Sequence, residues 1–194
     1  QYVKTRELEK VKPAFEDLLA RMRTDYIDLG MIHFVDEPEE FAKVTAGEFM
    51  DYVRQLKDGG KIRHIGISTH NPEVAKLAAL QGEIEMILFS INPAFDMMPA
   101  VRDIDQYFAD TYDEGLGGIA PIREELYKIC EQQNVGITVM KGYAGGRLFD
   151  AKTSPFGVAL TPVQCLHYAL TRPAVASVLA GYDTPEHVYA ATAY

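Results

Sequence analysis

The sequence predicts an α/β protein built on a parallel sheet, and three observations carry the prediction. Strand-like and helix-like segments alternate at spacings of about 25 to 50 residues along the 194-residue chain. The strand-like segments are short and mostly apolar, as strands buried on both faces are. Several helix-like segments begin with a capping residue followed by proline, which marks a helix start.

The chain begins with a helix followed by a strand. From Glu7 the apolar residues fall at helical spacing, namely at Leu8, Val11, Phe15, Leu18, Leu19 and Met22. The pattern then changes to a compact run from Tyr26 to His33, which predicts a strand.

A second helix and a second strand follow. Phe49, Tyr52, Val53 and Leu56 form the apolar side of a helix that ends at Asp58-Gly59-Gly60, since glycine adopts the left-handed backbone of a helix end. The run from Ile62 to Ser68 predicts the next strand.

The remaining elements repeat this alternation. Helix starts are expected at Asn71-Pro72, Thr161-Pro162 and Thr184-Pro185. The other strands are predicted at Met86 to Ile91, Gly136 to Met140 and Ala176 to Ala180, and the other helices near Ile122 to Gln133, Val163 to Leu170 and Pro185 to Ala193.

One segment, Pro93 to Ala120, is too long for an ordinary connection. We expect a functional loop or an inserted helix here, with its acidic residues in solvent. Taken alone, the pattern fits both a doubly wound open sheet and a (β/α)8 barrel. Five strands would complete the first but not the second, which needs about 250 residues, so the pattern alone favours the open sheet.

Composition excludes several classes of partner and site. The chain has 19 Lys plus Arg against 28 Asp plus Glu, a net charge of -9, with no basic run, so nucleic acid is not an expected partner. Cys130 and Cys165 predict two core thiols and neither a disulfide framework nor a metal site. No apolar run approaches ~18 residues and no signal peptide is recognised, so we expect a cytoplasmic protein without a membrane partner. The first residue is Gln1, so the true N-terminus is not in view.

Several motifs resemble the aldo/keto reductase superfamily. Thr24 to His33 resembles the family's fourth strand, Lys61 to Ser68 the fifth, and Val178 to Gly181 the eighth. Ile137 to Lys141 and Gly145 to Leu148 resemble the seventh strand and its loop. The resemblance overrides the open sheet: it implies an incomplete (β/α)8 TIM barrel of about five units, strands 4 to 8. Residues 1–194 would be the C-terminal portion of one barrel domain, with no second domain.

Other details resemble one branch of the family, predicted oxidoreductases with a C-terminal iron-sulfur, ferredoxin-like tail. They are Ser68 to Asn71, Met140-Lys141, Thr161 to Leu166 and Gly181 to Glu186. The resemblance implies that such a tail, with its cluster, would follow Tyr194.

The resemblance also implies an activity. In the family, a tetrad of Asp, Tyr, Lys and His reduces a carbonyl with hydride from NADP or NAD. Only the histidine, His33, is present here; the other three would precede Gln1, and Tyr2 and Lys4 are not expected to replace them. The piece alone is therefore expected to be inactive. The alternative is a non-catalytic binding or regulatory module of the same fold.

The resemblance assigns further residues to ligands. The expected cofactor contacts are Ser68, Thr69, Asn92, Lys141, Gly142, Gly145, Gly146, Arg147 and Gly181. Phe34 is expected to line the pocket for a small carbonyl or alcohol substrate. His70 is expected to line this pocket, to contact an acidic group of the substrate, or only to shape the turn.

Two departures from the family pattern concern the cofactor. Leu88 replaces a nicotinamide-contacting Gln, and Asp183 to His187 lacks the Arg or Lys that grips a 2'-phosphate. The acidic Asp183 and Glu186 therefore favour NAD over NADP, although both stay open. Neither the substrate nor the oligomeric state can be read from the sequence.

Overall fold

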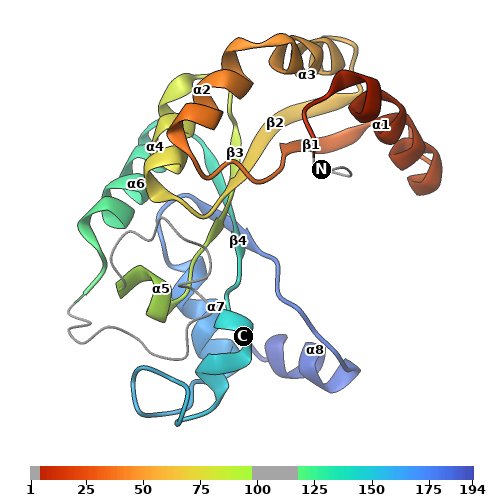
Figure 1. The fold of residues 1–194 in the computed structure, drawn as a ribbon. Helices are drawn as coiled ribbons and strands as arrows, with labels where there is room; N and C mark the ends of the chain where they lie inside the picture. The colour runs from red at the N-terminus through yellow and green to blue at the C-terminus, as the bar shows by residue number, and fades with distance from the viewer. Residues whose placement is uncertain (1–4, 98–117) are drawn as a thin grey trace.

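The computed structural model describes residues 5–97 and 118–194. Its sheet has five parallel strands in the order β1-β2-β3-β4-β5 (Figure 1). They are β1 (Ile27–Ile32), β2 (Ile62–Thr69), β3 (Met86–Ser90), β4 (Gly136–Met140) and β5 (Val175–Val178). Each strand pairs with the next one in the chain.

Helices connect the strands. They are α1 (Leu8–Met22), α2 (Pro38–Ala46), α3 (Glu48–Asp58), α4 (Pro72–Gln81), α5 (Pro93–Met97), α6 (Pro121–Gln132), α7 (Pro162–Leu170) and α8 (Pro185–Ala191), with a short 3-10 segment, η2 (Ala144–Phe149). In Figure 1, α2, α3, α4 and α6 lie along one side of the sheet.

The strand order decides between the two architectures that the pattern left open. A doubly wound sheet reverses its strand order at a switch point, whereas consecutive barrel units stay in sequence. The order here never reverses. The fold is therefore five consecutive units of a (β/α)8 barrel, as the resemblance implied, and the barrel is partial.

Most predicted elements are confirmed to within a few residues. Asn71, Thr161 and Thr184 each cap the helix that follows, and Thr161 forms a full capping box with Gln164. The fifth strand begins at Val175 rather than Ala176 and ends earlier than predicted.

The α2 helix is not among the elements that the sequence pattern predicts. This helix buries only Phe41 and Val44, so its apolar stripe is too short to stand out. Pro38 at its first turn, followed by Glu39, was a usable start signal.

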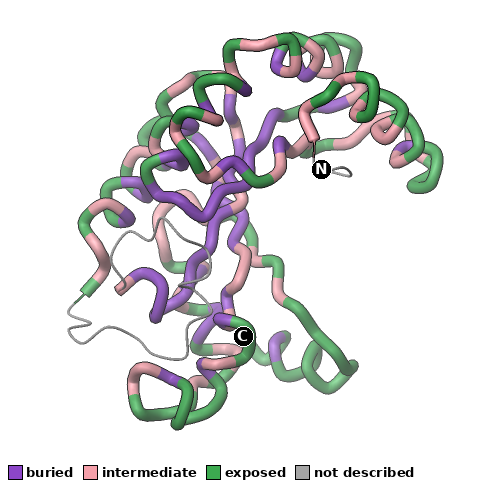
Figure 2. The backbone as a smooth tube through the Cα atoms, viewed as in Figure 1, coloured by how far each residue is buried: buried purple, intermediate pink, exposed green. Residues whose placement is uncertain are grey.

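Buried residues concentrate in the middle of the sheet. Figure 2 shows β2, β3 and β4 as mostly buried, whereas α8 is largely exposed. Within α8, only Ala191 is buried. The core is therefore densest around β2 to β4, and the two ends of the sheet are less well covered.

Both outer strands are open on one side. Among the described residues, β1 pairs only with β2 and β5 only with β4. Leu29 on β1 is 45% exposed, and Leu179 just after β5 is 59% exposed. Beside β1, a mainly apolar pocket of about 280 Å³ lies between α1, β1 and α3. These are the edges at which a complete barrel would continue.

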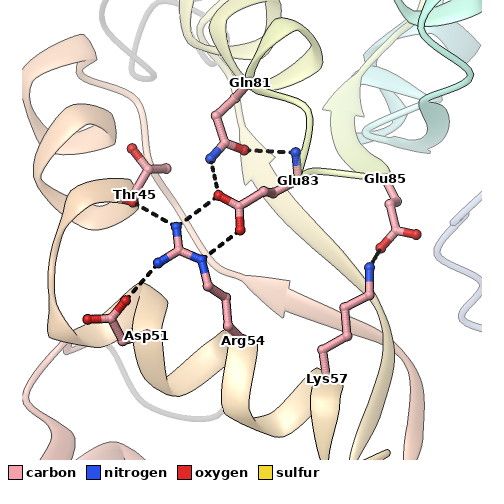
Figure 3. A network of polar contacts seen from close by, with 7 residues as sticks. All are labelled: Thr45, Asp51, Arg54, Lys57, Gln81, Glu83 and Glu85. Carbon is pink, nitrogen blue, oxygen red and sulfur yellow. Dashed lines mark hydrogen bonds and ion pairs between the residues drawn. The ribbon is translucent and has the colours of Figure 1, made fainter.

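Ion pairs hold the end of the sheet where β2 and β3 begin (Figure 3). Arg54 of α3 binds Glu83 through Nε and Nη2 at 2.7 and 2.8 Å, and Asp51 at 2.7 Å. Lys57 donates to Glu85 at 2.5 Å. These contacts fasten α3 to the segment before β3 and stabilise the end of the barrel opposite the strand C-termini.

The Pro93 to Ala120 segment begins with α5, so an inserted helix is confirmed at its start. Its acidic residues from Asp103 to Glu114 lie outside the described residues, as do Tyr2 and Lys4. Asp96 of α5 is fully buried, and the backbone N–H of Ala120 donates to its carbonyl oxygen at 2.7 Å. The two ends of the segment are thereby held together.

Within residues 5–97 and 118–194, every helix is too short or too polar to span a bilayer.

Candidate active site at the carboxyl ends of the strands

Every predicted site residue follows or ends a strand on the same edge of the sheet. His33 comes directly after β1, Ser68 and Thr69 end β2, and Lys141 comes directly after β4. Asn92 lies two residues beyond β3 and Gly181 three beyond β5. In register, Ile32 pairs with Ile67 and Ser90 with Met140, so the strands end at similar levels. The structure thus places these residues at the carboxyl ends of the strands, and the role of each residue is a separate question.

His33 lies in a pocket of about 430 Å³ lined by Thr5, Arg6, His33, Phe34 and Glu40. Arg6 donates to the carbonyl oxygens of His33 at 2.8 Å and Phe34 at 3.1 Å, and to Glu40 at 3.3 Å. Burial lowers the pKa of Arg6, and Glu40 only partly offsets this. The segment before α1 therefore fixes the backbone on which His33 sits.

Phe34 has a left-handed backbone, with φ 57°. A non-glycine residue in this region is uncommon and needs support from its surroundings. Its N–H donates to Ser68 Oγ at 2.7 Å, and the next N–H, of Val35, donates to the Ser68 carbonyl at 3.0 Å. Ser68 thus holds the turn that follows His33, and its own O–H can still donate.

Asp36 binds the turn after β2. Its carboxylate accepts hydrogen bonds from Thr69 Oγ1 at 3.0 Å, the His70 N–H at 2.7 Å and His70 Nδ1 at 2.9 Å. Its carbonyl oxygen accepts from Asn71 Nδ2 at 2.8 Å. We call these four residues, Asp36, Thr69, His70 and Asn71, the Asp36 clamp.

The Asp36 carboxylate is ionised at neutral pH. Burial alone would raise the pKa of Asp36, but the hydrogen bonds from His70 and Thr69 outweigh it and hold the pKa below its ordinary value. A carboxylate only accepts hydrogen bonds, so His70 Nδ1 carries the proton. His70 also packs edge-on against Phe34, with 5.6 Å between ring centroids.

Asn92 and Lys141 form a comparable contact between the ends of β3 and β4. Asn92 is fully buried; its Nδ2 donates to the Lys141 carbonyl at 2.9 Å and its Oδ1 accepts from Phe95 N–H at 2.9 Å. Lys141 has φ 56°, so it too needs such support. Burial lowers the pKa of Lys141, partly offset by the negative charge of Asp36.

The turn after β4 is shaped by glycine. Gly145 and Gly146 have φ 67° and 87°, which side-chain-bearing residues rarely adopt, and open space surrounds both Cα positions. At Gly142, a Cβ would lie 3.3 Å from Val178 Cγ1. Backbone N–H groups in such a turn can approach an anion closely.

Arg147 and Gly181 complete the predicted set. Arg147 ends the glycine turn within η2, half-buried, and Gly181 is exposed with open space around it. Between them, Tyr143 and Tyr182 approach each other, with 3.4 Å between the hydroxyl oxygens. Sequence reasoning had found neither this pair nor Asp36 and Arg6.

The arrangement brings groups that can donate hydrogen bonds, and a lysine, to one edge of the sheet. An imidazole lies next to a pocket, a hydroxyl lies on the neighbouring strand, and a glycine turn with a lysine lies two strands further. Among the described residues, no three His, Cys, Asp or Glu side chains gather as a metal site requires.

Comparison with known proteins identifies relatives. The family model for the aldo/keto reductase family matches residues 3–160. The oxidoreductase YdhF of Escherichia coli is 27% identical over 151 residues, which are 66% of this chain and 46% of that protein.

Solved structures share the fold. An aldo-keto reductase from Bacillus halodurans, in its holo form, superposes with a TM-score of 0.69 at 23% identity, covering 100% of this chain and 63% of the other. An aldo/keto reductase from Klebsiella pneumoniae, in complex with NADP and acetate, gives 0.62 at 19% identity, covering 94% and 58%. The chain thus spans less than two thirds of each of these relatives.

Proposed function

The chain belongs to the aldo/keto reductase family, and from that membership we propose that it is the C-terminal portion of one barrel domain, strands 4 to 8, of a nicotinamide-dependent oxidoreductase. The observation that carries the proposal is the shared edge on which His33, Ser68 and the glycine turn after β4 lie. Barrel enzymes place their chemistry at this edge.

The proposed reaction reduces a carbonyl to an alcohol, or runs in reverse. A nicotinamide held at this edge would supply hydride to the carbonyl carbon while the oxygen gains a proton; in the reverse direction it would accept hydride from the carbon while the oxygen loses the proton. His33 orients the carbonyl and donates a hydrogen bond to the oxygen, where negative charge develops. An Asp, Tyr and Lys upstream of Gln1 complete the site, with the Tyr as acid.

The proposed cofactor contacts divide into two groups. Ser68 and Thr69 serve the nicotinamide end, and Ser68 keeps an O–H to donate after accepting from Phe34. Gly142, Gly145, Gly146 and Gly181 give phosphate oxygens access to backbone N–H groups, with Lys141 and Arg147 supplying positive charge. Asn92 supports this group by holding the Lys141 carbonyl. Phe34 and His70 line the substrate side.

The cofactor is proposed to be NAD or NADP, with the acidic Asp183 and Glu186 favouring NAD. Two further proposals come from the sequence: an iron-sulfur tail after Tyr194, which the resemblance implies, and a cytoplasmic location. Iron and acid-labile sulfide analysis of the complete protein tests the tail, and cell fractionation tests the location.

Oxidation of NADH and NADPH, followed at 340 nm with a panel of aldehydes and ketones, tests the function. The complete protein should turn over, whereas residues 1–194 alone should not, because the acid and its lysine partner lie outside them. If residues 1–194 alone turn over a substrate and His33→Ala abolishes this activity, the proposal that the acid and its lysine partner lie outside these residues is wrong. A complete protein that binds neither dinucleotide would contradict the function itself.

A further inference from the structure

The turn after β2 is fixed mainly by hydrogen bonds to the loop between β1 and α2. Ser68 to Asn71 contains the two residues proposed to meet the nicotinamide, yet three hydrogen bonds to the Asp36 carboxylate and one to its carbonyl fix it from the β1–α2 loop. Two more hydrogen bonds, from the backbone N–H groups of Phe34 and Val35 to Ser68, run between the same two segments.

The Thr69 side chain is committed to this clamp. Thr69 is fully buried, its hydroxyl donates to Asp36, and the Asn71 N–H donates to the same oxygen at 3.1 Å. The hydrogen of the Thr69 hydroxyl is therefore used within the clamp, and Thr69 is proposed to meet the nicotinamide through its backbone. Of the two adjacent residues, Ser68 is the one whose hydroxyl has a hydrogen still to donate.

The Asp36 carboxylate suits this task chemically. Its side chain is 12% exposed and that of His70 is 10% exposed, so water competes little for their hydrogen bonds. Asn71, whose Nδ2 donates to the Asp36 carbonyl, also caps α4 by accepting from the Glu73 N–H, so the clamp is tied to the start of that helix. Both factors make the clamp a stiff support.

We propose that Asp36 is a positioning residue for the nicotinamide: it holds the Ser68–Asn71 turn so that Ser68 presents its hydroxyl to the carboxamide. This inference rests on the proposed function and deepens it. Asp36 does not itself touch the cofactor. Its loss should therefore weaken binding of the nicotinamide half of the dinucleotide and spare the phosphate half, which the turn after β4 holds.

Two ligands, one with and one without the nicotinamide, distinguish binding of the two halves of the dinucleotide. The probes are the dinucleotide that the complete protein binds and ADP-ribose, or its 2'-phospho form, which lacks the nicotinamide. For Asp36→Ala in the complete protein, dissociation constants from calorimetry should rise about 10- to 100-fold for the dinucleotide, and less than about twofold for ADP-ribose. A purely structural role would change the two constants together.

The other end of β2 offers a matched control, Glu85, which lies just before β3. Glu85 accepts hydrogen bonds from His64 Nδ1 at 3.0 Å and from the Ile65 N–H at 3.1 Å, so it is a second carboxylate that binds an imidazole and a backbone N–H. It lies at the opposite end of β2 from the site. Glu85→Gln should change neither dissociation constant.

If Asp36→Ala does not fold, Asp36→Asn and Thr69→Val test the same point with smaller expected losses, again confined to the dinucleotide. Equal losses for both ligands, no loss in any Asp36 or Thr69 variant, or the same pattern in Glu85→Gln would overturn the inference while leaving the proposed function intact. A wild-type protein that binds the dinucleotide no better than ADP-ribose would overturn both.

Discussion

The Ser68 hydroxyl group has two hydrogen-bonding roles. Its oxygen accepts from the Phe34 N–H, and its O–H is proposed to donate to the carboxamide of the cofactor. In the complete protein, Ser68→Ala should raise the dissociation constant of the dinucleotide about tenfold, or about 1.4 kcal/mol. A small drop in melting temperature should accompany it, because the Phe34 N–H loses its acceptor.

Ser177→Ala is the control for this prediction. Ser177 on β5 donates only to Thr138 Oγ1 at 3.2 Å and has no proposed ligand contact. Cofactor titration and thermal melting of both variants check the prediction. Equal cofactor affinity in wild type and Ser68→Ala would remove Ser68 from the proposed contacts.

Single residues were predictable where a strand or motif located them. His33 directly follows a recognisable strand and Ser68 lies in the last two residues of another, so the sequence located both. Asp36 and Arg6 are lone charged residues beside helix starts, and nothing in the local sequence distinguishes them. Their partners lie 27 to 35 residues away in sequence, so only the fold reveals what they hold.

At the element scale, capping chemistry was the most reliable signal. Asn71, Thr161 and Thr184 act locally, through hydrogen bonds to the N–H groups of their own helices, and their helix starts were predicted correctly. The placement of α5 depends instead on distant residues. Asp96 accepts from Arg123 Nε at 2.8 Å, Tyr127 at 2.5 Å and Tyr168 at 2.9 Å, which joins α5, α6 and α7.

Asp96→Asn should therefore be strongly destabilising. The change removes the negative charge that faces the buried Arg123 guanidinium, and breaking such a pair typically costs about 3 to 5 kcal/mol. Urea unfolding of the complete protein checks this. Glu124→Gln on the exposed face of α6, which loses a surface ion pair with Lys128, should leave the midpoint unchanged. Similar midpoints for both variants would show that the buried network contributes little.

The free energy of unfolding should depend on pH through the ionisation of Glu85. Burial alone would raise the pKa of Glu85, but hydrogen bonds from Lys57, His64 and the Ile65 N–H lower it to about 2 from 4.5. A lowered pKa contributes stability above pH ~4.5 that is lost as pH falls toward about 2. Because the side chain is 37% exposed, screening limits the contribution to about 1 kcal/mol.

Unfolding midpoints at pH 6 and pH 3 check this. Wild type should lose more stability on acidification than Glu85→Gln, and the two proteins should converge at low pH. If the difference between the two unfolding midpoints is the same at pH 6 and pH 3, the lowered pKa of Glu85 does not contribute to stability as proposed.

Across the whole molecule, the local pattern predicted five parallel units but not whether they form an open doubly wound sheet or part of a barrel. Alternation and apolarity are the same in an open sheet and in a barrel, and the pattern alone favoured the open sheet. The order β1-β2-β3-β4-β5, fixed by pairing between distant segments, decided the matter. The two open edges at β1 and β5 follow from the same order.

The variant His33→Ala in the complete protein tests whether His33 belongs to an active site. Removing a well-placed donor to a developing oxyanion typically lowers kcat by ~10² to 10³, about 2.7 to 4 kcal/mol. Steady-state kinetics should show a loss of this size, with cofactor affinity and melting temperature nearly unchanged. A near-wild-type kcat with much earlier melting would show that His33 is a structural histidine and would contradict the proposed active site.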